Sequence, residues 1–88
     1  MELKQRERDN KKKEIFKKCE EILNFRKIKY HKSNGKYFSS LEISPPAGIL
    51  LVIELEKREN KPLNLRFYKD GDTGELASLE QFSGLLHH

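Results

Sequence analysis

Hydrophobic and polar positions follow a helical spacing at the start of the chain. Residues 2–24 contain neither glycine nor proline, which favours one long helix. Its second half carries apolar residues at the spacing of a single helical face: Ile15, Phe16, Cys19, Ile22 and Leu23. Its first half has Leu3 as its one apolar residue after Met1. We therefore predict a solvated basic helical extension over residues 1–14 and a single α+β domain over residues 15–86.

Alternation of polar and apolar residues predicts strands after this helix. The predicted strands span residues 26–32, 37–44, 49–56 and 63–69. The dipeptide Asn34-Gly35 separates the first two, and both of its residues tolerate the positive φ of a type I′ turn. A two-residue loop there would place Ser33 opposite Lys36. In that register the core face carries Ile28, Tyr30, Tyr37, Leu41 and Ile43.

The later part of the chain predicts two turns and a short helix. Pro45-Pro46-Ala47-Gly48 ends the second strand, and residues 70–74 form a turn after the fourth. Ser78 and Gln81 have the spacing of a capping box, which predicts a helix that begins after Ser78. The sequence therefore predicts an α+β fold: an N-terminal helix, a four-stranded antiparallel meander sheet and a short C-terminal helix, with the helices packed on one sheet face.

Composition limits the chain to one small domain. It has 88 residues, of which 36% are charged and 35% hydrophobic. A core of this size gains from association, so we expect a homodimer. No run of residues approaches the ~18 apolar positions of a membrane-spanning helix, so we expect no membrane partner. The single cysteine, Cys19, lies on the apolar helix face and indicates an inert buried thiol in a reducing, cytoplasmic setting.

Charge is distributed unevenly along the chain. Residues 1–36 contain 13 Lys and Arg against 6 Asp and Glu, whereas residues 37–88 contain 5 against 8. A basic half attracts phosphates, anionic lipid or acidic protein. Helices rich in Lys and Glu are also commonly no more than solvated surface, and both interpretations stay open. Binding to a membrane surface is less supported, because the basic part lacks an opposing apolar face.

The predicted solvent face of the sheet combines cations with aromatic rings. Rings stack on unpaired bases and cations hold phosphates, which is the chemistry of single-stranded nucleic-acid platforms. The candidate binding residues are Lys27, Lys29, His31, Phe38, Arg66 and Tyr68 on the sheet, with Lys13 and Lys17 on the helix. The alternative is a solvated face with cross-strand ion pairs, such as Lys27 with Glu42 or Arg66 with a neighbouring glutamate.

Catalytic and metal-binding patterns are weak in this sequence. It contains no glycine-rich phosphate loop, no Cys/His metal spacing and no nucleophile with a base beside it. Residues 70–74 resemble the start of a calcium loop, but the third acidic ligand is missing and Gln81 occupies the twelfth position. We therefore expect no catalytic residues, no metal and no cofactor. His87 and His88 are left out of the functional argument, since paired histidines at this place fit both a native end and the remnant of a purification tag.

Two short resemblances to known families accompany these patterns. Residues 65–68 and 78–82 resemble the end of the single-strand-binding transcriptional coactivators of the positive-cofactor-4 type. Residues 16–19 and 33–35 are similar to the small Alu-domain subunits of the signal recognition particle, which bind RNA. Each resemblance covers less than half of the chain, and no functional residue is carried over from either. Both imply a small nucleic-acid-binding protein.

The sequence thus favours a small non-enzymatic nucleic-acid-binding protein that uses a basic and aromatic sheet face and a basic helix. Single strands are the favoured ligand, and the choice between DNA and RNA stays open. The alternative is a protein–protein adaptor or inhibitor of the phage or mobile-element type. Such a protein would dock through the exposed sheet, the edge strand or the long helix.

Overall fold

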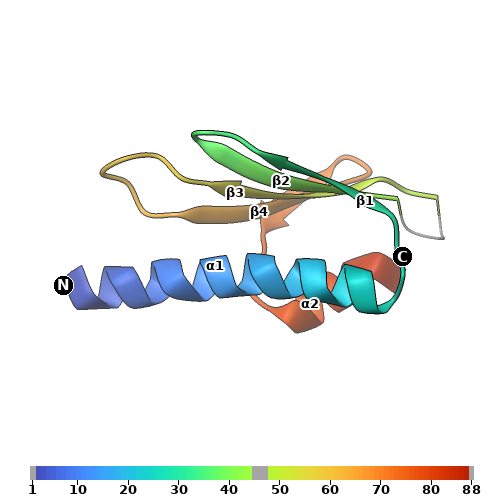
Figure 1. The fold of residues 1–88 in the computed structure, drawn as a ribbon, viewed down its shortest axis with the longest axis horizontal. Coiled ribbons are helices and arrows are strands. Elements are labelled where there is room, and N and C mark those ends of the chain that lie inside the picture. Colours follow the sequence, from blue (N-terminus) through green and yellow to red (C-terminus); the bar gives the residue numbers. More distant parts are fainter. Residues whose placement is uncertain (1, 45–47, 88) are drawn as a thin grey trace.

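The protein is a helix, a five-stranded antiparallel sheet and a second helix. The computed structural model describes residues 2–44 and 48–87, with side chains described from Lys4 onward, so residues 45–47 of the predicted Pro-Pro break lie outside it. The elements are α1 (Glu2–Phe25), β1 (Tyr30–Asn34), β2 (Phe38–Ile43), β3 (Leu51–Glu56), β4 (Asn64–Lys69), β5 (Asp72–Glu75) and α2 (Leu79–His87). The strands lie in chain order, each antiparallel to the next, and both helices lie beneath one face (Figure 1). The α+β prediction is confirmed, but the sheet has five strands instead of four.

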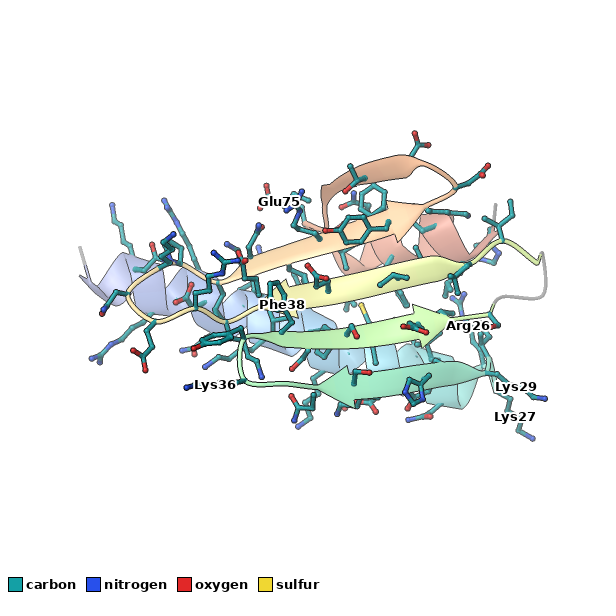
Figure 2. All side chains as sticks on the ribbon, turned by 90° about the horizontal axis from the view of Figure 1, so that it is seen from above. Arg26, Lys27, Lys29, Lys36, Phe38 and Glu75 are labelled. Carbon is teal, nitrogen blue, oxygen red and sulfur yellow. The ribbon has the colours of Figure 1, made fainter. Side chains whose placement is uncertain are left out.

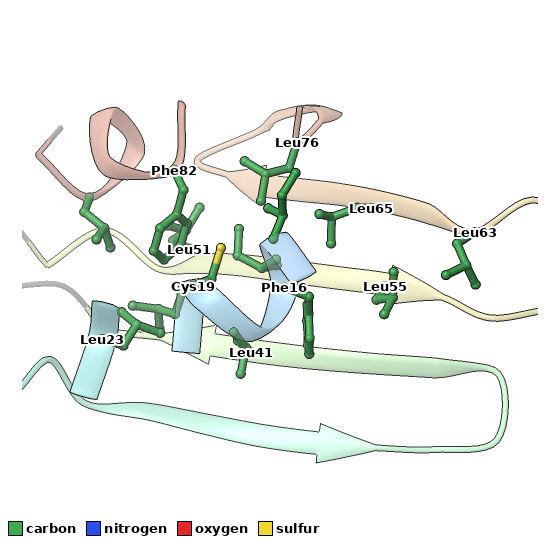
Figure 3. Close-up of a cluster of buried hydrophobic side chains, with 14 residues drawn as sticks. Phe16, Cys19, Leu23, Leu41, Leu51, Leu55, Leu63, Leu65, Leu76 and Phe82 are labelled. Carbon is green, nitrogen blue, oxygen red and sulfur yellow. The ribbon is translucent and has the colours of Figure 1, made fainter. Parts of the chain in front are cut away.

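The core lies between that face and the helices (Figure 3). On β3 the side chains of Leu51, Ile53 and Leu55 are buried, while their neighbours Val52 and Glu54 are half-buried on the other face. This alternation is the expected result of a sheet with one covered face. The remaining buried apolar residues come from every layer: Ile15, Phe16, Cys19, Leu23, Leu41, Ile43, Leu63, Leu65, Leu76, Phe82 and Leu86.

The end of α1 corrects the predicted first strand. Residues 26–28 close the helix instead of starting a strand: Ile28 N donates to Leu23 O at 2.9 Å, and Lys27 N donates to Asn24 O at 3.2 Å. Lys27 has a φ of 57°, in the left-handed region. These features form a Schellman motif, in which the apolar residue after the left-handed position packs back against the helix. Ile28 is half-buried against the core for this reason, and β1 begins only at Tyr30.

The β1–β2 hairpin has a longer loop than predicted. Asn34 pairs with Ser39 and Ser33 with Ser40, so residues 35–38 form a four-residue loop. Gly35 N donates to Phe38 O at 2.7 Å across this loop. The predicted register, Ser33 opposite Lys36, is wrong by four positions. Because four is an even number, Tyr30, Leu41 and Ile43 keep the face that the alternation assigned to them.

The turn predicted at residues 70–74 is shorter and leads into β5. Asp70 and Gly71 have φ values of 46° and 83°, and Lys69 pairs with Asp72 across them. Two consecutive positive φ values are typical of a type I′ hairpin, which fits the right-handed twist of the strands. Gly74 follows on β5, where a Cβ would lie 3.0 Å from Cε1 of Phe67. β5 has no alternating apolar residues, so the pattern gave no sign of it.

The predicted N-cap of α2 at Ser78 is confirmed, but the return bond of the predicted capping box joins Gln81 to Ala77 N instead of Ser78 N. Ser78 Oγ accepts a hydrogen bond from Gln81 N at 3.1 Å, and the Gln81 side chain reaches back to Ala77 N and Glu75 O at 2.8 and 3.0 Å. At the other end, the buried Lys69 of β4 donates from Nζ to the carbonyl of Leu85. A cation at free C-terminal carbonyls satisfies groups that have no partner within the helix.

The N-terminal half of α1 contacts the connection between β3 and β4. Asp9 Oδ1 accepts a hydrogen bond from Leu63 N at 3.1 Å, and Lys12 Nζ donates to Leu63 O at 2.6 Å. Gln5 also donates to Asp9, at 2.9 Å. Both backbone groups of Leu63 are therefore held by side chains of α1. The boundary after residue 14 stays a prediction, and these contacts lie within the extension that it defines.

Candidate nucleic-acid interface

The open face of the sheet is acidic over its middle. Its side chains are those that alternate with the core positions: His31, Ser33, Phe38, Ser40, Glu42, Val52, Glu54, Glu56, Asn64, Arg66, Tyr68, Thr73 and Glu75. Four of these are glutamates and one is an arginine, so the face has a net negative formal charge. Such a field repels the phosphates of a nucleic acid.

Arg66, the arginine of this face, lies among acidic neighbours. In the strand register Arg66 lies opposite Glu54 of β3 on one side and opposite Glu75 of β5 on the other. Its Cζ lies 5.8 Å from the ring centroid of Tyr68. His31 of β1 lies opposite Glu42 of β2 in the same sense. The positions predicted for His31, Arg66 and Tyr68 on the open face are correct, but their surroundings are more acidic than a binding platform requires.

The predicted lysines do not join this face. Lys27 and Lys29 lie in the connection between α1 and β1, at the other end of the β1–β2 strand pair from Phe38 (Figure 2). Lys13 and Lys17 are exposed on α1, which lies beneath the covered face. The structure therefore brings together four of the eight candidate residues on one face and leaves the four lysines on other surfaces.

A basic and aromatic cluster instead forms where two loops meet at one end of the sheet. Lys57 N donates to Tyr37 O at 2.7 Å, which joins the β3–β4 loop to the β1–β2 loop. Lys57 Nζ also donates to Asn34 Oδ1, at 3.2 Å. The side chain of Tyr37 is 47% exposed and that of Phe38 is 39% exposed. We call this cluster the loop tip and define it by Lys36, Tyr37, Phe38, Arg58 and Lys61.

Each ring of the loop tip has a cation beside it. Lys36 Nζ lies 5.3 Å from the ring centroid of Tyr37, and Arg58 Cζ lies 5.8 Å from that of Phe38. Both distances are in the range of a cation–π contact. Arg58 also forms an ion pair with Glu56, at 3.0 Å.

A hollow of about 460 Å³ opens between the two loops of the loop tip. Its walls are Tyr37, Phe38, Arg58, Glu59 and Lys61. Counting Lys57, the two loops carry four cations against one carboxylate, Glu59, and Glu56 at the end of β3 adds a second. The loop tip thus presents two rings for stacking and a positive surface for phosphates.

Sequence reasoning missed most of the loop tip. The predicted two-residue loop placed Tyr37 in a strand with its ring toward the core. Arg58 and Lys61 belong to a segment that the sequence predicted only as a polar loop. One signal was available: Lys36-Tyr37-Phe38 directly follows Asn34-Gly35 and joins a cation to two aromatic residues. Only the observed register shows that Arg58 lies across from Phe38, because β2 and β3 pair Phe38 with Glu56.

Other kinds of chemistry find little support in the described residues. They contain no group of three or more His, Cys, Asp or Glu side chains that could hold a metal ion. Burial raises the pKa of the Cys19 thiol to about 12, so the thiol stays protonated at neutral pH and is a poor nucleophile. No helix in the described ranges has the length and apolarity needed to cross a membrane.

The chain was compared with protein-family models, with curated proteins and with solved structures, and it matches none of them. The two short resemblances noted in the sequence therefore gain no support from these comparisons.

Proposed function

We propose that the protein binds single-stranded nucleic acid without catalysing a reaction, and that the loop tip is its binding surface. The observation that carries this proposal is the pairing of two exposed rings with two cations: Tyr37 with Lys36, and Phe38 with Arg58. A base can stack on an exposed ring while the neighbouring cation contacts its phosphate. The flanking lysines, Lys57 and Lys61, extend the positive surface along both loops.

We prefer the loop tip to the open sheet face as the binding surface for an electrostatic reason. Glu54 and Glu75 flank Arg66 in the middle of the face, whereas Arg58 at the loop tip faces one carboxylate, Glu56, and stands over an exposed ring. A polyanion therefore meets less repulsion at the loop tip.

We further propose that the protein acts in the cytoplasm and as a homodimer. Its one cysteine is fully buried and needs no oxidising compartment. Fourteen apolar residues are buried in the core among those that the structure describes, and a chain with so small a core gains stability from a partner.

The acidic open face supports a second candidate function, that of a protein adaptor or inhibitor. A basic segment of another protein would find Glu42, Glu54 and Glu75 on a surface that no helix covers. Under this proposal a partner captured from nuclease-treated lysate is lost when Glu54 and Glu75 are changed to glutamine, and the variants at the loop tip retain it. Retention of the partner by the glutamine variant would contradict it.

Fluorescence anisotropy with labelled oligonucleotides tests the nucleic-acid proposal. We expect oligothymidine and oligouridine of roughly 12 nucleotides to bind, within the usual site sizes of single-strand binders. Affinity should fall with salt by about 0.7 logarithmic units per tenfold salt for each phosphate contacted. Absence of a salt-dependent signal at micromolar protein would overturn the proposal.

Matched variants locate the binding surface. Tyr37→Ala should weaken binding roughly 5- to 150-fold, because one stacked base contributes about 1–3 kcal/mol. Arg58→Gln should also weaken binding, whereas Arg66→Gln removes a cation of the same type from the acidic face and should leave binding unchanged. Equal losses in the two arginine variants would contradict the assignment of the loop tip.

A further inference from the structure

Phe25 is the most exposed large apolar side chain of the described residues. It is the last residue of α1, and 88% of its surface is accessible to solvent. Beside it, Ile22 of α1 and Leu79 of α2 line a hollow of about 360 Å³ whose other walls are Lys18, Glu21 and Arg26. An exposed ring next to an apolar hollow indicates a docking surface.

The hollow continues along the crease between the two helices. A second hollow, of about 420 Å³, lies between α1 and the start of α2 and also has Lys18 and Leu79 in its walls. Ile15 and Glu14 line it further along α1. The outer surface of the helical layer thus carries a continuous apolar crease with charged residues along it.

We propose that a second copy of this chain occupies the crease, with the two α1 helices antiparallel across a two-fold axis near residue 20. This inference rests on the proposed homodimer and adds its surface and its register. The pattern of charges on α1 favours a second copy as the occupant. Glu14, Lys18 and Glu21 follow one another at helical spacing along the outer side of the helix, and Phe25 continues this stripe.

Within one chain Lys18 forms an ion pair with Glu14 at 3.0 Å. An antiparallel arrangement adds an opposite charge across the axis to each of Glu14, Lys18 and Glu21. Lys18 faces the partner's Glu21, and by symmetry Glu21 faces the partner's Lys18. Arg26, next to Phe25, approaches the partner's Glu14. A two-fold interface of this kind is self-complementary and closes as a dimer.

The same register places the exposed ring. Counting from the axis, Phe25 reaches the level of the partner's Ile15, where Ile15 and Leu79 line the second hollow. Burial of a large ring in an apolar pocket at the centre of an interface is typical of residues that dominate binding. A second copy therefore supplies both an aromatic ring for the apolar hollow and opposite charges for the residues beside it.

Sedimentation equilibrium on the full chain tests both the homodimer and its surface. We expect the wild-type protein to sediment with twice its chain mass of 10.4 kDa. Lys18→Glu alone and Glu21→Lys alone should each weaken the dimer roughly tenfold or more, because each creates two like-charge pairs across the axis. An equimolar mixture of these two variants should recover the dimer, since each cation then faces a carboxylate of the other chain.

Phe25→Ser should also weaken the dimer, and circular dichroism should show an intact fold because the ring contributes nothing to the core. Tyr37→Ser, at the loop tip, is the matched control and should keep the wild-type mass. A wild-type monomer at all concentrations would overturn the homodimer and its surface together. A wild-type dimer that all three α1 variants leave unchanged, or a mixture that stays monomeric, would overturn this surface and register while the homodimer itself stands.

Discussion

The two faces of the sheet share one backbone but differ in what their side chains meet. On β3, Leu51, Ile53 and Leu55 point into a layer closed by two helices, while Val52 and Glu54 point away from it. Alternation is enough to assign the covered face, because the apolar residues there are buried or half-buried for the same reason. The open face has no such common requirement, and its chemistry depends on which residues the register places side by side.

The covered face is apolar at its centre and polar at its borders. Asp9 and Lys12 hold the backbone of Leu63 at one end, Glu20 contacts Tyr30 and Lys32 along β1, and Lys69 reaches α2. The covered face is thus fixed by packing in the middle and by hydrogen bonds around it. The following variants separate these contributions from those of the open face.

The two faces should differ most in how much a substitution lowers the free energy of unfolding, and two adjacent residues of β3 show this. Ile53→Ala removes a fully buried side chain and should lower the free energy of unfolding by about 2–5 kcal/mol. Val52→Ala, on the half-buried open face, should cost about 1 kcal/mol. Urea denaturation followed by circular dichroism measures both. Similar losses in the two variants would contradict the division of the sheet into a core face and a solvent face.

The hydrogen bonds beside Leu63 should contribute less to the free energy of unfolding than the buried side chains do. Asp9→Ala leaves the Leu63 N–H without its acceptor and should cost about 1–2 kcal/mol in the same assay. Glu7→Ala is the control, since Glu7 is exposed on α1, and should change stability by less than about 0.5 kcal/mol. If Asp9→Ala were as neutral as the control, the first half of α1 would behave as the solvated extension that the sequence predicted.

A substitution of Lys27 shows whether this lysine, which the sequence predicted for the open face, takes part in nucleic-acid binding. It occupies a left-handed position at the end of α1, which favours glycine. Lys27→Gly should therefore raise the free energy of unfolding by up to about 1 kcal/mol and leave oligonucleotide affinity unchanged. Thermal denaturation and anisotropy on the same sample measure the two quantities. A clear loss of affinity would return Lys27 to the binding surface.

The contact between α1 and β1 should depend on pH. A hydrogen bond from Lys32 and another from Tyr30 lower the pKa of Glu20, and burial opposes them. Because the folded state has the lower pKa, the contact stabilises the fold above the usual pKa of glutamate. This stabilisation is lost as the pH falls through the pKa of the folded state.

Glu20→Gln measures this contribution. Since both partners are partly exposed, the variant should lose roughly 0.2–1 kcal/mol at neutral pH and approach the wild type at low pH. Urea denaturation at several pH values provides the comparison. A stability difference that grows on acidification would contradict the assigned direction.

Two dipeptides show how far the sequence predicts the fold. Asn34-Gly35 and Asp70-Gly71 are both dipeptides that favour a type I′ turn. Only Asp70-Gly71 forms a two-residue hairpin. At the first site the Asn34 side chain accepts hydrogen bonds from Ser39 and Lys57, and it lies inside the strand pairing. Contacts with a third segment decided the loop length, and a local pattern holds no information about them.

The candidate site was predicted less completely than the fold for the same reason. The alternation correctly placed Arg66 and Tyr68 on the open face, because that requires only the period of a strand. The neighbours of Arg66 and the meeting of Phe38 with Arg58 depend on pairings between strands and loops that lie far apart in the sequence. Lys27 was misplaced because a lysine took the left-handed position where glycine would have marked the end of the helix.

A nitrogen-15 NMR titration with oligothymidine tests the central claim most directly, because it reports on both regions of the open surface in one experiment. We predict that the amide signals of residues 35–38 and 57–61 shift progressively with added oligonucleotide. The signals of His31, Val52 and Arg66, on the acidic middle of the sheet, should stay in place. Shifts concentrated on these three residues, or no shifts at a protein concentration where anisotropy reports binding, would contradict the assignment of the loop tip.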